Sequence, residues 1–154
     1  MIRKVHINEA VIIKDLINSF AQSGLLLPLS LSEVYDRLRD FFVYIQEFPD
    51  GPPKIVGVCA LHIIWENLTE IRSLAVHEDY RKKGIGSQLV KACLKEAADL
   101  GTKKVFCLTY NTKFFSFLGF KEIDKAELPH KIWADCLKCS KFPECIEIAM
   151  IYEF

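Results

Sequence analysis

Hydrophobic positions follow a helical spacing in the first quarter of the chain. Apolar residues recur every three or four positions over Glu9–Gln22, directly after Asn8, which can cap a helix. Gly24 is a typical residue to end such a helix. The pattern Ser30-x-x-Glu33 is a capping box, so a second helix is expected to begin there.

Strand-like segments dominate the rest of the chain. Phe42–Phe48 and Lys54–Trp65 are rich in β-branched and aromatic residues, and the intervening Pro49–Pro53 has turn chemistry, which predicts a hairpin. The other expected elements are strands at Ile2–Ile7, Thr69–Val76, Lys103–Thr109 and Ile146–Tyr152, a further strand starting at Phe120, a helix ending at Leu100 before Gly101, and a short helix at Thr112–Leu118. This order predicts an α+β fold with an antiparallel meander and one strand–helix–strand crossover.

Composition narrows the class of protein. A chain of 154 residues with 51% hydrophobic residues is expected to form one domain, residues 1–154, and is too apolar to be disordered. Its 20 basic and 20 acidic residues balance, so no strong field favours nucleic acid or an anionic membrane as a partner. Apolar runs such as Gly24–Leu29 are too short to span a bilayer, and the N-terminus is not that of a signal peptide. A soluble cytoplasmic protein is therefore expected.

One segment carries a chemical signal. A strand ending at Val76 leads into the turn Arg81-Lys82-Lys83-Gly84 and then into the helix that Ile85-Gly86-Ser87 opens. Helix N-termini present unpaired N–H groups and a partial positive charge, and glycines let the backbone approach a ligand closely. Together these features predict a cradle for a diphosphate. The alternative is an ordinary helix start beside a solvated basic turn.

These residues resemble a known family. The run Arg81-x-x-Gly84-x-Gly86 after Leu74-Ala75-Val76, with Asn111 and Phe115-x-x-Leu118-Gly119-Phe120 further on, is similar to motifs of the GNAT superfamily of N-acetyltransferases. Four further segments resemble the acetyltransferase domain of N-acetylglutamate synthases, enzymes that serve arginine biosynthesis: Asp15–Leu26, Thr69–Val76, Leu108–Tyr110 and Leu128–Lys131. The segment Trp133–Cys139 resembles the tail of the short, stand-alone members of that group.

The resemblance implies a GNAT-like mixed, mostly antiparallel sheet flanked by helices, with acetyl-CoA as co-substrate and no metal required. It implies that the backbone of Leu74, Ala75 and Val76 pairs with the pantetheine arm. The implied coenzyme-binding residues beyond that strand are Arg81, Lys82, Lys83, Gly84, Ile85, Gly86 and Ser87 at the diphosphate, and Asn111, Phe114 and Phe115 near the thioester.

The acceptor amine must lose a proton before it attacks the thioester. Glu70 is the candidate base, directly or through water, and Arg72 could clamp a substrate carboxylate through its guanidinium. Strand alternation places Glu70, Arg72, Leu74 and Val76 on one face if no bulge intervenes. The structural alternatives are that Glu70 is an exposed surface residue and that Arg72 forms an ion pair with Glu70. A backbone N–H near Val76 would hold the oxyanion.

The chain departs from the family at two positions. Phe115 stands where many members carry a tyrosine that protonates the leaving thiolate. Tyr110 is a possible substitute, or no acid is used. Leu29 stands where relatives tend to carry a basic residue, so Lys131 or His130 could supply that charge instead, the alternative being a solvated loop.

The six cysteines form two groups. Cys59, Cys93 and Cys107 fall in apolar patterns and are expected to be buried. Cys136, Cys139 and Cys145, with His130, could bind zinc, but free or redox-active thiols are the preferred interpretation.

Three functions stay open at this point. The first is an N-acetyltransferase acting on the α-amino group of a small amino acid, with L-glutamate or a relative such as glutamine as the acceptor. The second is a GNAT enzyme for another amine, such as a polyamine, an aminoglycoside or a protein N-terminus. The third is a non-catalytic CoA-binding module. A homodimer is possible in each case.

Overall fold

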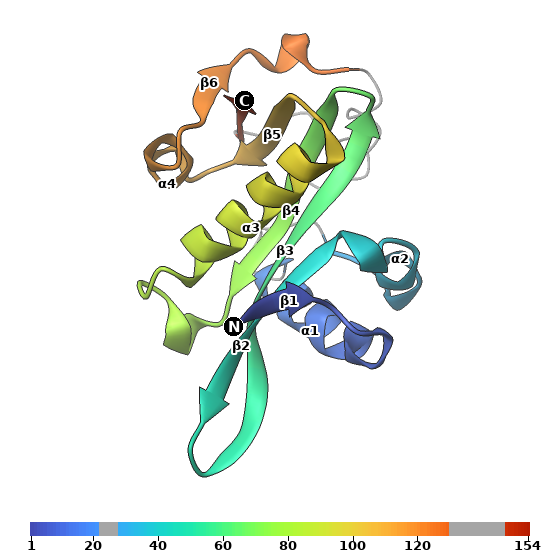
Figure 1. The fold of residues 1–154 in the computed structure, drawn as a ribbon, viewed down its shortest axis with the longest axis vertical. Coiled ribbons are helices and arrows are strands. Elements are labelled where there is room, and N and C mark those ends of the chain that lie inside the picture. Colours follow the sequence, from blue (N-terminus) through green and yellow to red (C-terminus); the bar gives the residue numbers. More distant parts are fainter. Residues whose placement is uncertain (22–27, 130–146) are drawn as a thin grey trace. The chain divides into compact units, whose positions relative to one another are not determined.

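The computed structural model describes residues 1–21, 28–129 and 147–154. Figure 1 shows the path of the chain. Its strands are β1 (Ile2–Lys4), β2 (Phe41–Phe48), β3 (Gly51–Trp65), β4 (Leu68–Val76), β5 (Lys104–Thr109), β6 (Lys121–Ile123) and β7 (Ile148–Glu153). Its α-helices are α1 (Ala10–Ala21), α2 (Leu31–Asp36), α3 (Ile85–Leu100) and α4 (Thr112–Phe117), with 3-10 turns η1 (Ile7–Glu9), η2 (Leu38–Asp40), η3 (Glu78–Tyr80) and η4 (Lys125–Glu127).

The strands follow the hydrogen-bonded order β1-β2-β3-β4-β5-β7-β6. The β1–β2, β2–β3, β5–β7 and β6–β7 pairs are antiparallel, whereas β4 and β5 are parallel. The expected mixed, mostly antiparallel α+β fold is confirmed. The described residues divide into two compact units, Met1–His62 with Ile71–Glu96, and Ile63–Glu70 with Ala97–Phe154.

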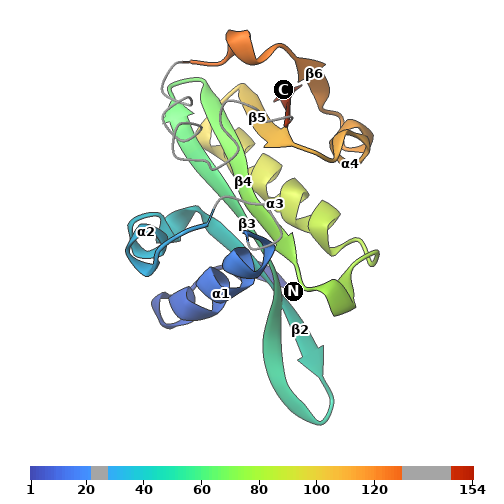
Figure 2. The same cartoon turned by 180° about the vertical axis from the view of Figure 1, so that it is seen from behind.

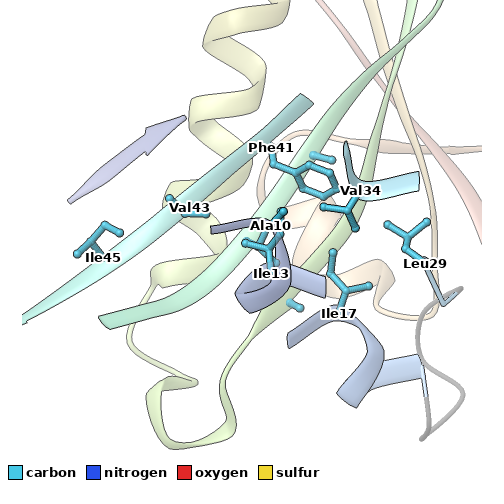
Figure 3. Close-up of a cluster of buried hydrophobic side chains, with 11 residues drawn as sticks. Ala10, Ile13, Ile17, Leu29, Val34, Phe41, Val43 and Ile45 are labelled. Atoms are coloured by element: carbon cyan, nitrogen blue, oxygen red, sulfur yellow. The ribbon is translucent and has the colours of Figure 1, made fainter. Parts of the chain in front are cut away.

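The core of the first unit lies between helices α1 and α2 and the strands β2 to β4. Figure 3 shows the buried side chains that fill it. They come from α1, from α2 and the residues directly before it, and from alternate positions of the strands: Ala10, Ile13, Ile17, Leu29, Val34, Phe41, Val43, Ile45, Val58, Ala60 and Ala75. Of the expected helical stripe on α1, Ile13 and Ile17 lie in this core and Leu16 and Phe20 pack against it, whereas Ile12 is 51% exposed.

The opposite face of β2 and β3 packs against α3. A Cβ added at Gly57 would lie 3.0 Å from Leu89 Cδ1, 3.1 Å from Ile85 Cγ2 and 3.4 Å from Tyr44 Cβ, so the absence of a side chain admits α3. Cys59 and Cys93 meet at the same interface, with 3.7 Å between their sulfur atoms. Both thiols are buried, as expected, and so is Cys107 in the second unit.

The second unit is built on β5, β7 and β6. Its core consists of Ile64, Phe106, Leu128 and Ala149, with Leu68, Leu108, Ile123 and Ile151 packed against it. An aromatic row joins α4 to β7. Phe115 lies edge-on to Phe120 with 5.2 Å between ring centroids, and Phe120 lies 5.5 Å from Tyr152.

Element boundaries near the N-terminus and at the hairpin differ from the sequence expectation. The first strand ends at Lys4, because Glu9 turns back to accept two hydrogen bonds from Arg3 (2.8 and 2.7 Å) and one from the His6 backbone (2.7 Å). The hairpin turn, at the bottom of Figures 1 and 2, is also shorter, since β3 begins at Gly51. The Ser30–Glu33 capping box is confirmed.

Candidate functional site

The turn after β4 has an unusual backbone conformation. Lys82 and Gly84 both lie in the left-handed region, with φ of 62° and 79°. Helix α3 begins at Ile85, and its first helical bond runs from Gln88 N to Gly84 O at 3.1 Å. The N–H groups of Ile85, Gly86 and Ser87 therefore have no partner within the helix. Left-handed residues beside a helix N-terminus form a concave set of amides suited to an anion.

The basic side chains of this turn are exposed, but Arg81 and Lys83 each contact an aromatic ring. The guanidinium carbon of Arg81 lies 4.7 Å from the centroid of the Phe20 ring, and its Nε donates to Val76 O at 3.2 Å. Lys83 Nζ lies 5.3 Å from the centroid of the Tyr80 ring. Positive charge is thus concentrated beside the α3 N-terminus, where an anion would offset its repulsion from the helix dipole.

Strand β4 does not alternate regularly over its whole length. Ser73 has φ of 54°, which is left-handed backbone in the middle of the strand. Four residues were expected on one face of this strand only if it was regular: Glu70, Arg72, Leu74 and Val76. Because Ser73 interrupts the regular alternation, that condition is not met. In the first unit Arg72, Leu74 and Val76 are half-buried and Ala75 is buried, so this segment keeps part of its surface accessible.

Glu70 belongs to the second unit, where its side chain is nearly buried. Glu70 is 6% exposed and pairs with Phe106 of β5 in the parallel register. Burial raises the pKa of the neighbouring Cys107 thiol, and the negative charges of Glu70 and Glu147 raise it further. Glu70 is therefore a buried carboxylate beside β5 and not a solvated surface glutamate.

The end of β5 carries the remaining predicted residues of this unit. Asn111 caps α4, because its Oδ1 accepts a hydrogen bond from Phe114 N at 3.2 Å. Phe115 is buried, with its ring 5.0 Å from that of Phe114. Tyr110 is half-buried between β5 and this cap. The structure therefore brings Tyr110, Asn111, Phe114 and Phe115 into one short segment.

Leu29 has a structural role in this chain. Its side chain is in the first unit's core at 6% exposure, and its N–H and C=O each bond to the Asn18 side-chain amide at 3.0 Å. This position supports the helices rather than presenting charge. His130, Lys131, Cys136, Cys139 and Cys145 lie outside the described residues. Within residues 1–21, 28–129 and 147–154, no cluster of three His, Cys, Asp or Glu side chains could hold a metal ion.

Three residues near the candidate site were not singled out from the sequence alone. Thr109 is buried, and its Oγ1 accepts a hydrogen bond from Asn111 N at 2.8 Å, which fixes the turn after β5. A polar residue at the end of an apolar strand was the available signal. Glu147, directly before an apolar strand, offered a similar signal. The left-handed Ser73 offered none, because serine is common in regular strands and turns alike.

The described part of the chain contains no helix with the length and apolar character required to cross a membrane.

Comparison with known proteins agrees with this geometry. A model of the acetyltransferase (GNAT) family matches residues 16–120. An uncharacterized N-acetyltransferase of Chlorobaculum tepidum, CT2212, is 39% identical over 150 residues, covering 97% of this chain and 94% of the relative. The amino-acid acetyltransferase of Mycobacterium tuberculosis is 37% identical over 124 residues, covering 80% of this chain and 70% of the relative.

Two solved structures have a similar fold. Rv2747 from Mycobacterium tuberculosis, in complex with CoA and NLQ, has a TM-score of 0.83 at 29% identity and covers 100% of this chain and 99% of its own. N-acetylglutamate synthase from Neisseria gonorrhoeae, complexed with coenzyme A and N-acetyl-glutamate, has a TM-score of 0.86 at 23% identity. That likeness concerns the fold alone and covers 99% of this chain but 34% of the synthase. The resemblance drawn from the sequence motifs is confirmed.

Proposed function

Because the chain belongs to the GNAT family of acetyltransferases and so uses acetyl-CoA as its acyl donor, we propose that it acetylates the α-amino group of a small amino acid, with L-glutamate as the first acceptor to test. The relative named amino-acid acetyltransferase, with 37% identity over 80% of this chain, is the observation that carries the choice of acceptor class. The CoA complexes of similar folds support the donor.

The donor is held by the backbone from Lys82 to Ser87. The amides of Ile85, Gly86 and Ser87 and the left-handed backbone at Lys82 and Gly84 receive the diphosphate. The half-buried segment from Leu74 to Val76 pairs with the pantetheine arm, and Asn111 with Phe114 and Phe115 borders the thioester end. This arrangement uses main-chain donors, which a side-chain substitution leaves in place unless the new residue is proline.

The acceptor side of the proposal rests on Glu70, Arg72 and Tyr110. Glu70 takes the proton of the substrate ammonium group, and the neutral amine attacks the thioester carbonyl carbon. The tetrahedral oxyanion accepts a hydrogen bond from the backbone near Val76, the C–S bond breaks, and CoA leaves as the thiolate, to which Tyr110 can donate a proton. The attacking nitrogen loses its second proton as the amide forms, and that proton restores the Tyr110 hydroxyl. Arg72 binds the α-carboxylate of the acceptor through its guanidinium. Lys131, outside the described residues, is proposed to contact the acceptor's side chain.

The deciding experiment measures release of free thiol from acetyl-CoA across a panel of acceptors. The panel contains L-glutamate, L-glutamine, L-leucine, spermidine, an aminoglycoside and a short peptide with a free N-terminus. Turnover of glutamate or glutamine, with mass-spectrometric detection of the N-acetyl product, is the expected result. Turnover confined to spermidine, the aminoglycoside or the peptide assigns another amine. Tight CoA binding without turnover of any acceptor contradicts an enzymatic role.

A pair of variants tests the acceptor contact separately. Arg72→Ala is expected to raise the KM for the amino acid by about 10-fold or more, because a charge-assisted pair is lost, and to leave the KM for acetyl-CoA unchanged. Arg39→Ala, which removes an exposed guanidinium from η2, is the matched control and should change neither constant. Equal behaviour of the two variants would remove Arg72 from the proposed site.

A further inference from the structure

The side chain of Arg81 is committed to two contacts within the first unit. Its Nε donates to Val76 O, the last residue of β4, at 3.2 Å. Its guanidinium carbon stacks over the ring of Phe20, near the end of α1, at 4.7 Å from the centroid. Arg81 therefore links its turn to the end of β4, which lies close in sequence, and to the end of α1, which lies far from it in sequence.

The backbone next to Arg81 needs such support. Lys82 adopts φ of 62°, a conformation that a residue with a side chain keeps only when its surroundings enforce it. The preceding turn is held by the bonds from His77 N to Val56 O at 2.8 Å and from Tyr80 N to His77 O at 2.9 Å, whereas the bond from Arg81 N to Glu78 O is long, at 3.5 Å. Directly before the left-handed Lys82, the chain is therefore fixed by the hydrogen bond from the Arg81 side chain to Val76 O.

We propose that Arg81 is a positioning residue: it braces the turn against Phe20 and Val76 so that the amides of the α3 N-terminus face the diphosphate, and it does not serve as a phosphate ligand. This inference rests on the proposed function. A guanidinium suits this role because it is planar, stacks on aromatic faces and offers an in-plane Nε donor, which an ammonium group lacks. The exposed Lys82 and Lys83 supply charge to the same turn.

A double-mutant cycle on coenzyme affinity tests the brace. CoA binding is measured by calorimetry for the wild type, Arg81→Gln, Phe20→Leu and the double variant. Each single change is expected to weaken CoA binding by about two- to five-fold, as loss of an exposed cation–π contact implies. The double variant should bind no more weakly than the weaker single variant, because both changes remove one shared contact.

Three controls separate positioning from charge. Lys91→Gln removes a positive charge from the exposed side of α3 and should leave CoA affinity unchanged. Phe20→Tyr retains the ring and should behave as the wild type, which keeps the test valid if Phe20→Leu folds poorly. Arg81→Lys keeps the charge but loses the Nε bond to Val76, so its CoA affinity is expected to fall. At saturating acetyl-CoA, kcat of Arg81→Gln should match the wild type while KM for acetyl-CoA rises.

The outcomes assign failure to one claim or the other. If the wild type binds CoA and the two single losses multiply in the double variant, Arg81 acts independently of Phe20 and the inference is overturned. Full affinity in Arg81→Lys, with loss in Arg81→Gln, would show that charge alone matters and would also overturn it. If the wild type binds no CoA, the proposed function fails and the inference falls with it.

Discussion

Substitution of Gly57 by alanine probes the contact that seats α3 on the sheet. The added Cβ would stand 3.0 Å from Leu89 Cδ1 and 3.1 Å from Ile85 Cγ2, closer than ordinary packing allows. Neither neighbour can move aside freely, because Leu89 is 0% and Ile85 is 4% exposed. The third neighbour, Tyr44 Cβ at 3.4 Å, belongs to the backbone-paired strand opposite Gly57.

The expected cost follows from two opposing terms. Replacing glycine by alanine stabilises a strand by about 0.4–1 kcal/mol through the unfolded state. Overpacking a buried contact costs about 1–3 kcal/mol. Gly57→Ala should therefore lower the free energy of unfolding by about 1–2 kcal/mol. Since Ile85 opens α3, displacement of this first turn should also weaken CoA binding by about three- to ten-fold.

The assay compares Gly57→Ala with Gly51→Ala by urea unfolding and by CoA calorimetry. Gly51 lies in the same strand, and a Cβ added there meets nothing within 4 Å. This control should be as stable as the wild type or slightly more so, with unchanged CoA affinity. The packing argument would be refuted if the two variants were equally stable and bound CoA equally well.

Three further changes test other parts of the structure. Glu70→Gln should lower kcat by roughly 10²–10⁴-fold while CoA affinity stays constant, as steady-state kinetics with calorimetry would show; wild-type turnover would end its assignment as base. Hydrogen bonds from Arg3 hold the pKa of Glu9 at about 2, below its ordinary value of 4.5, so this carboxylate stabilises the fold above pH 4.5 and the contribution is lost as pH falls towards 2. Glu9→Gln should lower the free energy of unfolding by about 1–3 kcal/mol at pH 7 and should make that free energy less dependent on pH under acidic conditions, as denaturant titrations at a series of pH values would show. An unchanged pH dependence would contradict the Arg3–Glu9 pairing. Gly119→Ala should destabilise by about 1–2 kcal/mol in urea, because φ is 99° and the new Cβ would lie 3.1 Å from Tyr152 Cε2, and a stability equal to that of the wild type would show that the turn can relax.

Local signals in the sequence predicted local structure well. The Ser30–Glu33 capping box is present in full, and Gly101 ends α3 with φ of 89°. Gly84, singled out because glycine lets the backbone approach a ligand closely, lies in the left-handed region, with φ of 79°. Each of these features depends on a few neighbouring residues whose chemistry is visible in the sequence.

Features that depend on distant partners could not be predicted. The Arg3–Glu9 pair shortened the expected first strand, and the insertion of β7 between β5 and β6 depends on pairing across the whole unit. Leu29 was interpreted as a departure from a basic position, but the burial of its side chain in the core explains why the residue is apolar. In the same way, Arg81 was expected at the diphosphate from its charge and from the family resemblance, and its contacts with Phe20 and Val76 appear only in the structure.

The burial of Cys59 and Cys93 where β3 meets α3 gives the protein an internal reporter of opening. A thiol reagent can modify these two sulfur atoms only in molecules whose helix has separated from the strand, so their modification rate measures that event under native conditions. Cys107 reports in the same way on β5 of the second unit. Peptide-resolved mass spectrometry of one labelled sample would thus reveal whether the two units open together or one after the other.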